Sequence, residues 1–290
     1  MTGLGKSILV VGASGRSGGL VAQELAKRDF TVKALVRDHA GEHRARANGA
    51  TEVAIGDLRN SATLDKALDG VYGVYHVGPP FVADEAELGV AMVEAARRAK
   101  VGKFVFSSVI HPANGLANHT SKLPVEAAIL KSGLDFTILY PATLFQNFAA
   151  GWKTIAQTGV FAEPYGKEVR LARVDYRDVA EVVAIAFLDR RLSHGSFELA
   201  ADGMPDRGEI ARLMSEVLGK LISVAVPSFQ SWAAQAQLPF DERQLRELER
   251  VYESYSLYGS PGNSLTLRAI LGREPRALKE YFQQLAVANA

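Results

Sequence analysis

The 290-residue sequence contains no cysteine, which excludes disulfide bonds, a thiol nucleophile and metal sites built on thiolates. It also lacks a surplus of charge of either sign, because 33 basic residues stand against 32 acidic ones and the formal net charge is +1. Such a balance gives no strong field that would recruit nucleic acid or an anionic membrane. We therefore expect any bound anion to be held by local geometry.

Long apolar runs are missing as well, since no segment approaches the roughly twenty residues that cross a bilayer. The first apolar run, Ile8–Val11, leads directly into glycines and is typical of a strand. The six histidines show no spacing typical of a metal site, and we expect no metal. With 48% hydrophobic residues the chain can bury a sizeable core, and we predict a soluble, cytoplasmic protein.

The first half of the chain alternates short β-branched runs with helical patterns, which is typical of βαβ units and a parallel sheet. Helices are predicted at Leu20–Lys27 and Ala86–Ala99, and the second places Leu88, Met92, Ala95 and Ala99 on one face that should pack in the core. Strands are predicted at Ser7–Ala13, Thr31–Arg37, Glu52–Asp57, Val71–Val77, Lys103–Val109 and Asp135–Leu139.

The pattern changes after Pro141 to mostly helical segments, among them a charged amphipathic helix at Asp241–Tyr258. We predict a doubly wound α/β domain over residues 1–148 and a smaller α+β substrate lobe over residues 149–290. Two strand-like segments of the lobe, at about residues 169–174 and 196–200, are candidates to extend the sheet.

A glycine loop, Gly12-Ala-Ser-Gly15-Arg-Ser-Gly18, lies between the first predicted strand and a helix. Glycine permits the tight turn and the close approach of a pyrophosphate, while the helix N-terminus offers free N–H groups and partial positive charge. The sequence therefore predicts a Rossmann-type dinucleotide site. The residues expected to hold the pyrophosphate are Gly12, Ser14, Gly15, Arg16, Ser17 and Gly18.

Selection between NADP and NAD should occur at the end of the second strand. Arg37 stands there, and together with Arg16 it could grip a 2′-phosphate. Asp38 offers the alternative, because its carboxylate could accept hydrogen bonds from the bare ribose of NAD. We predict NADP(H) as the preferred cofactor and keep NAD(H) open.

The glycine spacing, together with Ser121-Lys122-x-x-x-Glu126 and the Leu139-Tyr140-Pro141 segment followed by Phe145-Gln146-Asn147, resembles the NmrA-like branch of the atypical short-chain dehydrogenase/reductases. The resemblance continues through Phe197–Pro227 and implies an NAD(P)-binding protein. Members of this branch are reductases, for example of quinones or aromatic compounds, or catalytically silent redox sensors.

The resemblance also places Asp57 and Leu58 against the adenine, although Asp57 could equally cap a turn without any ligand. Val77, Gly78 and Pro79 follow the fourth strand and should wall the cofactor cleft, or form a plain turn. Cofactor contacts are further expected from Ser107, Tyr140 and Pro141, and substrate contacts from Phe81, Ser108, Phe145 and Asn147. Alternatively, Ser107 and Ser108 could satisfy backbone groups at the strand end, and Tyr140 could serve in aromatic packing between the domains.

Reductases of the wider superfamily carry Tyr-x-x-x-Lys, but the position four residues before Lys122 is Asn118. Asparagine cannot donate a proton as tyrosine does, so tyrosine-dependent carbonyl reduction is in doubt. By resemblance, Lys122 is the expected ribose contact and a candidate proton donor, unless it is a solvated lysine at a helix start. His119 is a second candidate for proton donation, since histidine titrates near neutral pH.

Two functions follow from these residues. The first is an NADPH-dependent reductase that transfers hydride to a small acceptor such as a quinone or aromatic compound, because the cofactor carries the hydride chemistry. The second is a non-enzymatic sensor whose protein partner would respond to NADP(H) occupancy. We expect a small-molecule substrate in the first case, and neither nucleic acid nor membrane as a partner in either.

Overall fold

The computed structural model describes residues 2–289 and divides the chain into two compact units. The sheet unit comprises the chain up to Pro141 together with Tyr176–Glu198, and the helical unit comprises Ala142–Asp175 and the chain from Leu199 onward. The chain therefore passes between the two units three times.

A seven-stranded sheet forms the centre of the sheet unit, in the order β10-β6-β5-β4-β1-β2-β3. Each of the neighbouring pairs from β3 to β6 runs parallel. Strand order reverses direction at β1, so the carboxyl ends of β1 and β4 flank the switch point where such sheets bind ligands. The strands are β1 (Ser7–Val11), β2 (Thr31–Val36), β3 (Glu52–Ile55), β4 (Gly73–Val77), β5 (Lys103–Ser107), β6 (Phe136–Pro141) and β10 (Gly195–Leu199).

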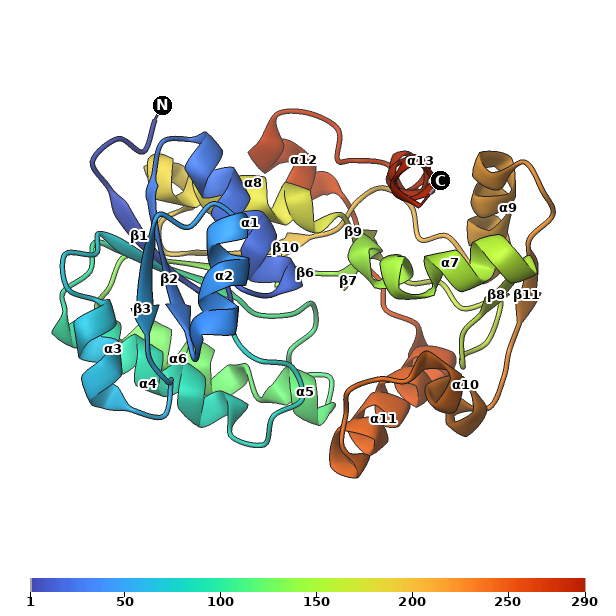
Figure 1. Cartoon of the computed structure of the whole chain (residues 1–290), viewed down its shortest axis with the longest axis horizontal. Coiled ribbons are helices and arrows are strands. Elements are labelled where there is room, and N and C mark those ends of the chain that lie inside the picture. The colour runs from blue at the N-terminus through green and yellow to red at the C-terminus, as the bar shows by residue number, and fades with distance from the viewer. Residues whose placement is uncertain (1, 290) are drawn as a thin grey trace. The chain divides into compact units, whose positions relative to one another are not determined.

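Helices cover both faces of this sheet, with α1, α2 and α8 on one face and α3, α4 and α6 on the other (Figure 1). This arrangement confirms the predicted doubly wound α/β fold. The helices of the unit are α1 (Arg16–Lys27), α2 (His39–Ala47), α3 (Ser61–Ala67), α4 (Glu85–Arg98), α5 (Ala117–Thr120), α6 (Leu123–Lys131), α8 (Tyr176–Leu188) and the short 3₁₀ helix η2 (Arg190–Leu192).

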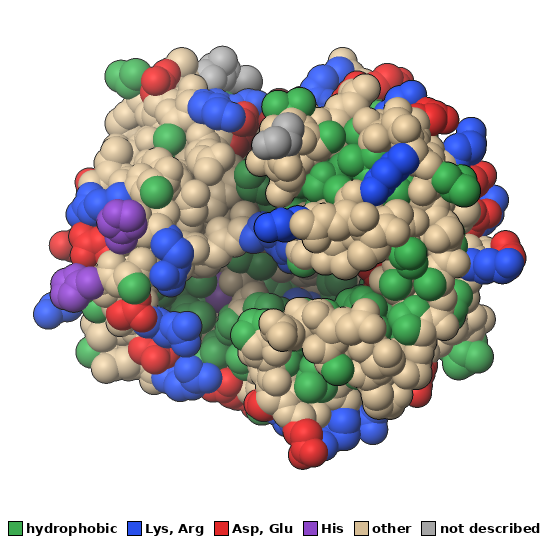
Figure 2. All heavy atoms as spheres, turned by 45° about the vertical axis from the view of Figure 1, so that its right-hand side comes forward, with side chains coloured by type: hydrophobic (Ala, Val, Ile, Leu, Met, Phe, Trp, Pro, Cys, Tyr) green, Lys and Arg blue, Asp and Glu red, His purple; other side chains and the backbone are tan. Residues whose placement is uncertain are grey.

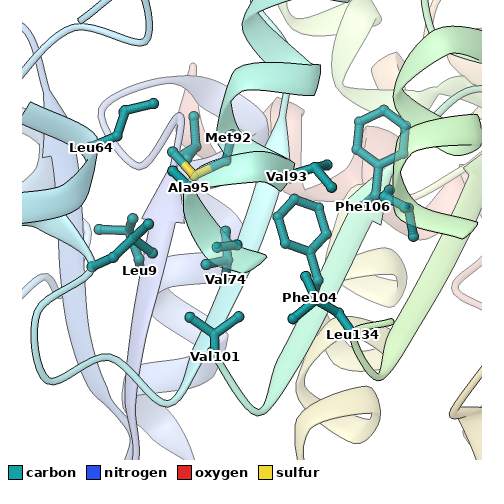
Figure 3. Close-up of a cluster of buried hydrophobic side chains, with 14 of the residues drawn as sticks. Leu9, Leu64, Val74, Met92, Val93, Ala95, Val101, Phe104, Phe106 and Leu134 are labelled. Carbon is teal, nitrogen blue, oxygen red and sulfur yellow. The ribbon is translucent and has the colours of Figure 1, made fainter. Parts of the chain in front are cut away.

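One hydrophobic cluster fills the space between the sheet and the layer of α3, α4 and α6 (Figure 3). Met92 and Ala95 of α4 point into it, as the helical spacing predicted, and meet Val74 of β4. The prediction was wrong for Ala99, which is exposed because α4 ends at Arg98 and Ala99 is its C-cap. Phe104 and Phe106 extend the cluster toward α6. The carboxyl edge of the sheet is thus anchored on a rigid core, which fixes the loops that leave it.

The helical unit contains two short parallel pairs of strands, β7 (Thr143–Leu144) with β9 (Arg173–Val174) and β8 (Val160–Ala162) with β11 (Ser223–Ala225). Its own core is aromatic, and Trp152 stacks on Phe282 with ring centroids 5.3 Å apart. Its helices are η1 (Phe145–Asn147), α7 (Phe148–Thr158), α9 (Arg207–Leu218), α10 (Phe229–Ala236), α11 (Glu242–Tyr258), α12 (Leu265–Leu271) and α13 (Leu278–Ala288).

The two strand-like segments of the predicted lobe have different outcomes. The segment near residues 196–200 corresponds to β10, which joins the large sheet beside β6. The segment near residues 169–174 does not extend that sheet, because only Arg173–Val174 is a strand and it pairs with β7. Periodicity identified both as strands but could not say which partner each would find.

Acidic and basic side chains are interspersed over the face shown in Figure 2, in keeping with the balanced composition. Of the helices in residues 2–289, none is long and apolar enough to cross a membrane. Across the same residues, no group of three or more His, Asp and Glu side chains is arranged to hold a metal ion.

Candidate cofactor site

The glycine loop leaves β1 in a conformation that only small residues permit. Gly12 has φ +85°, in the left-handed region, and its carbonyl oxygen accepts from the Gly15 N–H at 2.9 Å. A Cβ on Gly18 would lie 2.9 Å from the Ala13 nitrogen and would clash with the Gly12 carbonyl. The loop, the strand and α1 therefore touch backbone to backbone, which is the packing that a dinucleotide loop requires.

The N-terminus of α1 offers donors without a capping side chain. Its N-cap residue is Gly15, which makes no side-chain cap, whereas Asp38 caps α2 and Asn60 caps α3. The first turn of α1 therefore receives no capping side chain from Gly15, and the helix dipole favours an anion there. Of the predicted loop contacts, Arg16 is exposed and Ser14 is partly exposed.

Arg37 and Asp38 follow β2 at the carboxyl edge and are both exposed. Asp38 Oδ1 accepts from the Gly41 N–H at 2.6 Å, so one oxygen of the carboxylate is committed to capping α2. Within residues 2–289, Arg37 has no hydrogen-bond or ion-pair partner. Its guanidinium is available to a ligand, while Asp38 already serves the fold.

Asp57 and Leu58 follow β3 and take part in a turn. Asp57 Oδ1 accepts from the Arg59 N–H at 2.9 Å, which is the capping role weighed against adenine binding. Leu58 packs on the edge of the core cluster. Beyond β4, Phe81 has φ +57°, a strained conformation for a side chain of this size.

Lys122 lies in a buried cluster instead of in solvent. Its ammonium group forms an ion pair with Glu85 Oε1, and the other Glu85 oxygen accepts from Ser121 Oγ at 3.0 Å. Only 12% of the Lys122 side chain and 4% of the Glu85 side chain are exposed. Lys122 also donates to the Asn118 carbonyl at 3.3 Å, so the residue in the place of the usual tyrosine acts through its backbone.

Glu126, the last residue of the Ser-Lys motif, holds two further predicted residues. It accepts from Ser108 Oγ at 2.6 Å and from the Tyr140 hydroxyl at 3.0 Å. Burial and the neighbouring carboxylate of Glu126 raise the pKa of Tyr140 to about 12. Tyr140 therefore keeps its proton at neutral pH and acts as a hydrogen-bond donor.

Ser107 belongs to a buried hydroxyl network at the end of β5. Its Oγ lies 3.0 Å from the Tyr176 hydroxyl, which is in turn 2.6 Å from the hydroxyl of Tyr75. Ser17 of the glycine loop also hydrogen-bonds Tyr176. Burial raises the pKa of both tyrosines, so both stay protonated. The network ties the glycine loop to β4 and β5.

Comparison with known proteins places these residues in a family. The model of the NmrA-like family matches residues 5–284. The chain belongs to the NmrA-like family. The NAD(P)H azoreductase of Xenophilus azovorans is 28% identical over 284 residues, which cover 97% of this chain and 98% of the azoreductase.

Two solved structures share the NmrA-like fold of this chain. The NADPH-dependent quinone oxidoreductase of Escherichia coli, complexed with NADPH, has a TM-score of 0.83 at 23% identity and covers 96% of this chain and 99% of its own. The negative transcriptional regulator NmrA, in complex with NADP, has a TM-score of 0.78 at 18% identity and covers 98% and 96%. A reductase and a regulator thus have the same fold.

The predicted site residues of this NmrA-like protein divide between the two units. The glycine loop, the residues after β2 to β5, and Lys122 all lie in the sheet unit, as does Pro141, whose carbonyl accepts from the Ile110 N–H at 3.0 Å. Phe145 and Asn147 belong to the helical unit. Phe145 is 3% exposed and packs on Tyr281, so its burial gives no support to a substrate contact, while Asn147 is exposed.

Sequence reasoning missed Glu85 and Tyr176. Glu85 lies 37 residues before Lys122, and Tyr176 lies 69 residues beyond Ser107. No local motif marks either residue, because the partners of both are distant in the sequence. The only available signal for Glu85 was an acidic residue at the start of α4, which also suits a plain helix N-terminus.

His119 is buried, and desolvation lowers its pKa to about 4, with a smaller effect of the Lys122 charge. Its Nδ1 lies 2.9 Å from the Asn114 amide nitrogen. His76 stacks on Phe106 and has its pKa lowered to about 3 by burial and by Lys122. Both imidazoles are uncharged at neutral pH, which disfavours the predicted proton donation by His119.

These two histidines predict a loss of stability in acid. In the folded protein the pKa is about 4 for His119 and about 3 for His76, against 6.5 for an unperturbed histidine. As the pH falls, the unfolded chain therefore takes up protons before the folded protein does. The stability that is present above pH 6.5 is lost as the pH falls toward these folded-state values. Each histidine should lower the free energy of unfolding by about 2 kcal/mol between about pH 7 and about pH 5. Urea unfolding followed by circular dichroism measures this loss.

The test variant is His76→Phe, in which phenylalanine takes the place of the imidazole beside Phe104 and Phe106. The control variant is His43→Phe, at an exposed position on α2. His76→Phe should roughly halve the acid-induced loss, and His43→Phe should leave it unchanged. An equal loss in wild type and His76→Phe would contradict the assignment.

Proposed function

We propose that this NmrA-like protein binds NADP(H) at the carboxyl edge of the large sheet and reduces a small conjugated acceptor, such as a quinone or another aromatic compound. The observation that carries the proposal is the glycine loop with its uncapped helix, because the backbone contact at Gly18 and the left-handed Gly12 fit a pyrophosphate. The reductase names of the azoreductase and quinone oxidoreductase relatives support the reaction class.

The residues of the chain would divide the work of binding. The α1 N-terminus would receive the pyrophosphate, and Arg37, with Arg16, would take the 2′-phosphate. Asp57 and Leu58 would lie at the adenine, and Val77, Gly78 and Pro79 would wall the cleft. Lys122, Tyr140 and Ser107 would face the nicotinamide end, and Phe81 and Ser108 the acceptor.

When bound, NADPH supplies the hydride. Reduction of a quinone consumes one hydride and one proton and yields the hydroquinone. Tyr140 is a poor proton donor because its pKa is about 12, and His119 is uncharged at neutral pH. The proton should therefore come from Lys122 or from water.

Turnover tests the proposal directly. The purified protein is mixed with NADPH and a panel of quinones and azo compounds, and the absorbance of the reduced nicotinamide is followed. Oxidation of NADPH that requires an added acceptor, and that Lys122→Ala slows at low NADPH concentration, supports the reductase. Failure to bind NADPH or NADH would overturn the proposal.

A redox sensor is the second candidate, favoured by Asn118 in the place of the tyrosine and by the NmrA regulator among the structural neighbours. Tight binding of NADPH without turnover of any acceptor would select it. Such a protein would also need a protein partner that distinguishes its NADP-bound and NADPH-bound forms.

Arg37 should set the cofactor preference. Replacing Arg37 by alanine removes charge-assisted hydrogen bonds to a 2′-phosphate and should weaken NADPH binding by about 10- to 100-fold, with little change for NADH. Fluorescence titration of both cofactors measures the ratio. Arg44→Ala, an exposed arginine on α2, is the control. Equal weakening of both cofactors would show that Arg37 does not read the phosphate.

A further inference from the structure

The ion pair of Glu85 and Lys122 is more deeply buried than folding stability requires. Glu85 is 3% exposed as a residue, and both charges are removed from water. Burying two charges is costly, and an apolar pair of similar size is often as stable or more stable. A reason other than stability should therefore keep this pair at the carboxyl edge of the sheet.

The surrounding chain is shaped to hold the Glu85 carboxylate. A Cβ on Gly78 would lie 2.5 Å from Glu85 Oε1, so glycine at this position leaves room for the carboxylate. Glu85 is also the first residue of α4, where the helix dipole favours its negative charge. Ser121 occupies its second oxygen. The position of the Glu85 carboxylate is thus fixed by Gly78 after β4, by the start of α4 and by Ser121.

Lys122 has three N–H donors, and two of them are accounted for. One goes to Glu85 and one to the Asn118 carbonyl, which leaves the third for a ligand and fixes the direction of the ammonium group. If Lys122 gave its proton to a substrate, Glu85 would become a buried carboxylate without its cationic partner. The pair therefore disfavours transfer of the Lys122 proton to a substrate.

We propose that Glu85 is a positioning residue, which holds Lys122 as an oriented, ion-paired hydrogen-bond donor for the cofactor, so that water supplies the proton of the reduction. The inference rests on the proposed binding of NADPH and deepens it. It assigns Lys122 to binding and removes it from the proton transfer.

A double-mutant cycle with NADPH as the probe tests this role. Glu85→Gln and Lys122→Met should each raise the NADPH dissociation constant about tenfold, and the double variant should bind no worse than Lys122→Met alone. Glu87→Gln, an exposed carboxylate on α4, is the control and should bind as wild type does. In turnover, Glu85→Gln should raise KM for NADPH and change kcat by less than about threefold.

The outcomes separate structural and functional explanations. Each single variant leaves one buried charge without its partner and can therefore fail to fold, whereas the double variant has no charge at either position. The double variant thus keeps the test valid where a single variant unfolds. Additive losses of about a hundredfold in the double variant, or a fall in kcat at constant KM, would overturn the inference. Wild type that binds NADPH while Glu85→Gln is unchanged overturns this inference alone; wild type that does not bind NADPH overturns the proposed function and the inference together.

Discussion

Gly18→Ala should abolish measurable NADPH binding or weaken it at least about tenfold. The added methyl group would lie 2.9 Å from the Ala13 nitrogen and would clash with the Gly12 carbonyl, both of them backbone atoms that cannot rotate away. The helix α1 must therefore move outward, which misplaces the N–H groups that would hold the pyrophosphate. Titration with NADPH measures the loss.

The control for Gly18→Ala is Gly151→Ala in the interior of α7. A Cβ there meets only Ile155 at 3.8 Å, an ordinary contact, so the substitution should stabilise the helix by about 0.5–1 kcal/mol and leave NADPH binding unchanged. Overpacking by Gly18→Ala should instead cost about 1–3 kcal/mol of stability. Unaltered NADPH binding in a folded Gly18→Ala protein would refute the pyrophosphate assignment.

Arg207→Met should destabilise the helical unit by about 4 kcal/mol. Arg207 has no exposed surface, and its guanidinium donates to four backbone carbonyls, those of Phe161, Glu163, Tyr165 and Ala225. Methionine fills much of the same space but removes four charge-assisted hydrogen bonds. Of the four carbonyls, that of Ala225 still accepts from the Glu163 N–H at 3.4 Å, and a buried acceptor that loses its donor is costly.

Tryptophan fluorescence follows this unfolding selectively, because both tryptophans, Trp152 and Trp232, lie in the helical unit. Arg212→Met, an exposed position on the same helix, should change the free energy of unfolding by less than about 0.5 kcal/mol. Similar losses in both variants would mean that the four carbonyl contacts contribute little.

The glycine loop could be predicted from the sequence because strand, turn and helix are consecutive in the chain. Gly12 and Gly18 need only their immediate neighbours to fix their roles. The same holds for the core stripe of α4, where helical spacing alone places Met92 and Ala95 inward. Local sequence patterns were therefore sufficient to predict the fold class and the family.

Roles that depend on distant partners could not be predicted. Asp38 and Asp57 occupy positions that suit a ligand and a cap equally, and only the structure shows the hydrogen bonds to Gly41 and Arg59. The position of Lys122 was predicted, but its ion pair with Glu85 depends on the packing of α4 against the start of α6. Sequence spacing indicates candidate residues, whereas their charge state depends on tertiary neighbours.

The interrupted course of the chain between its two units has a consequence for synthesis. The sheet unit lacks α8 and β10 until residue 198 has been made, 57 residues after Pro141 by subtraction. At about 5–20 residues per second this delay is about 3–11 s. During it, the face of α1 that packs on α8 is bare and β6 is an open edge, so the nascent chain should need chaperone protection in that interval.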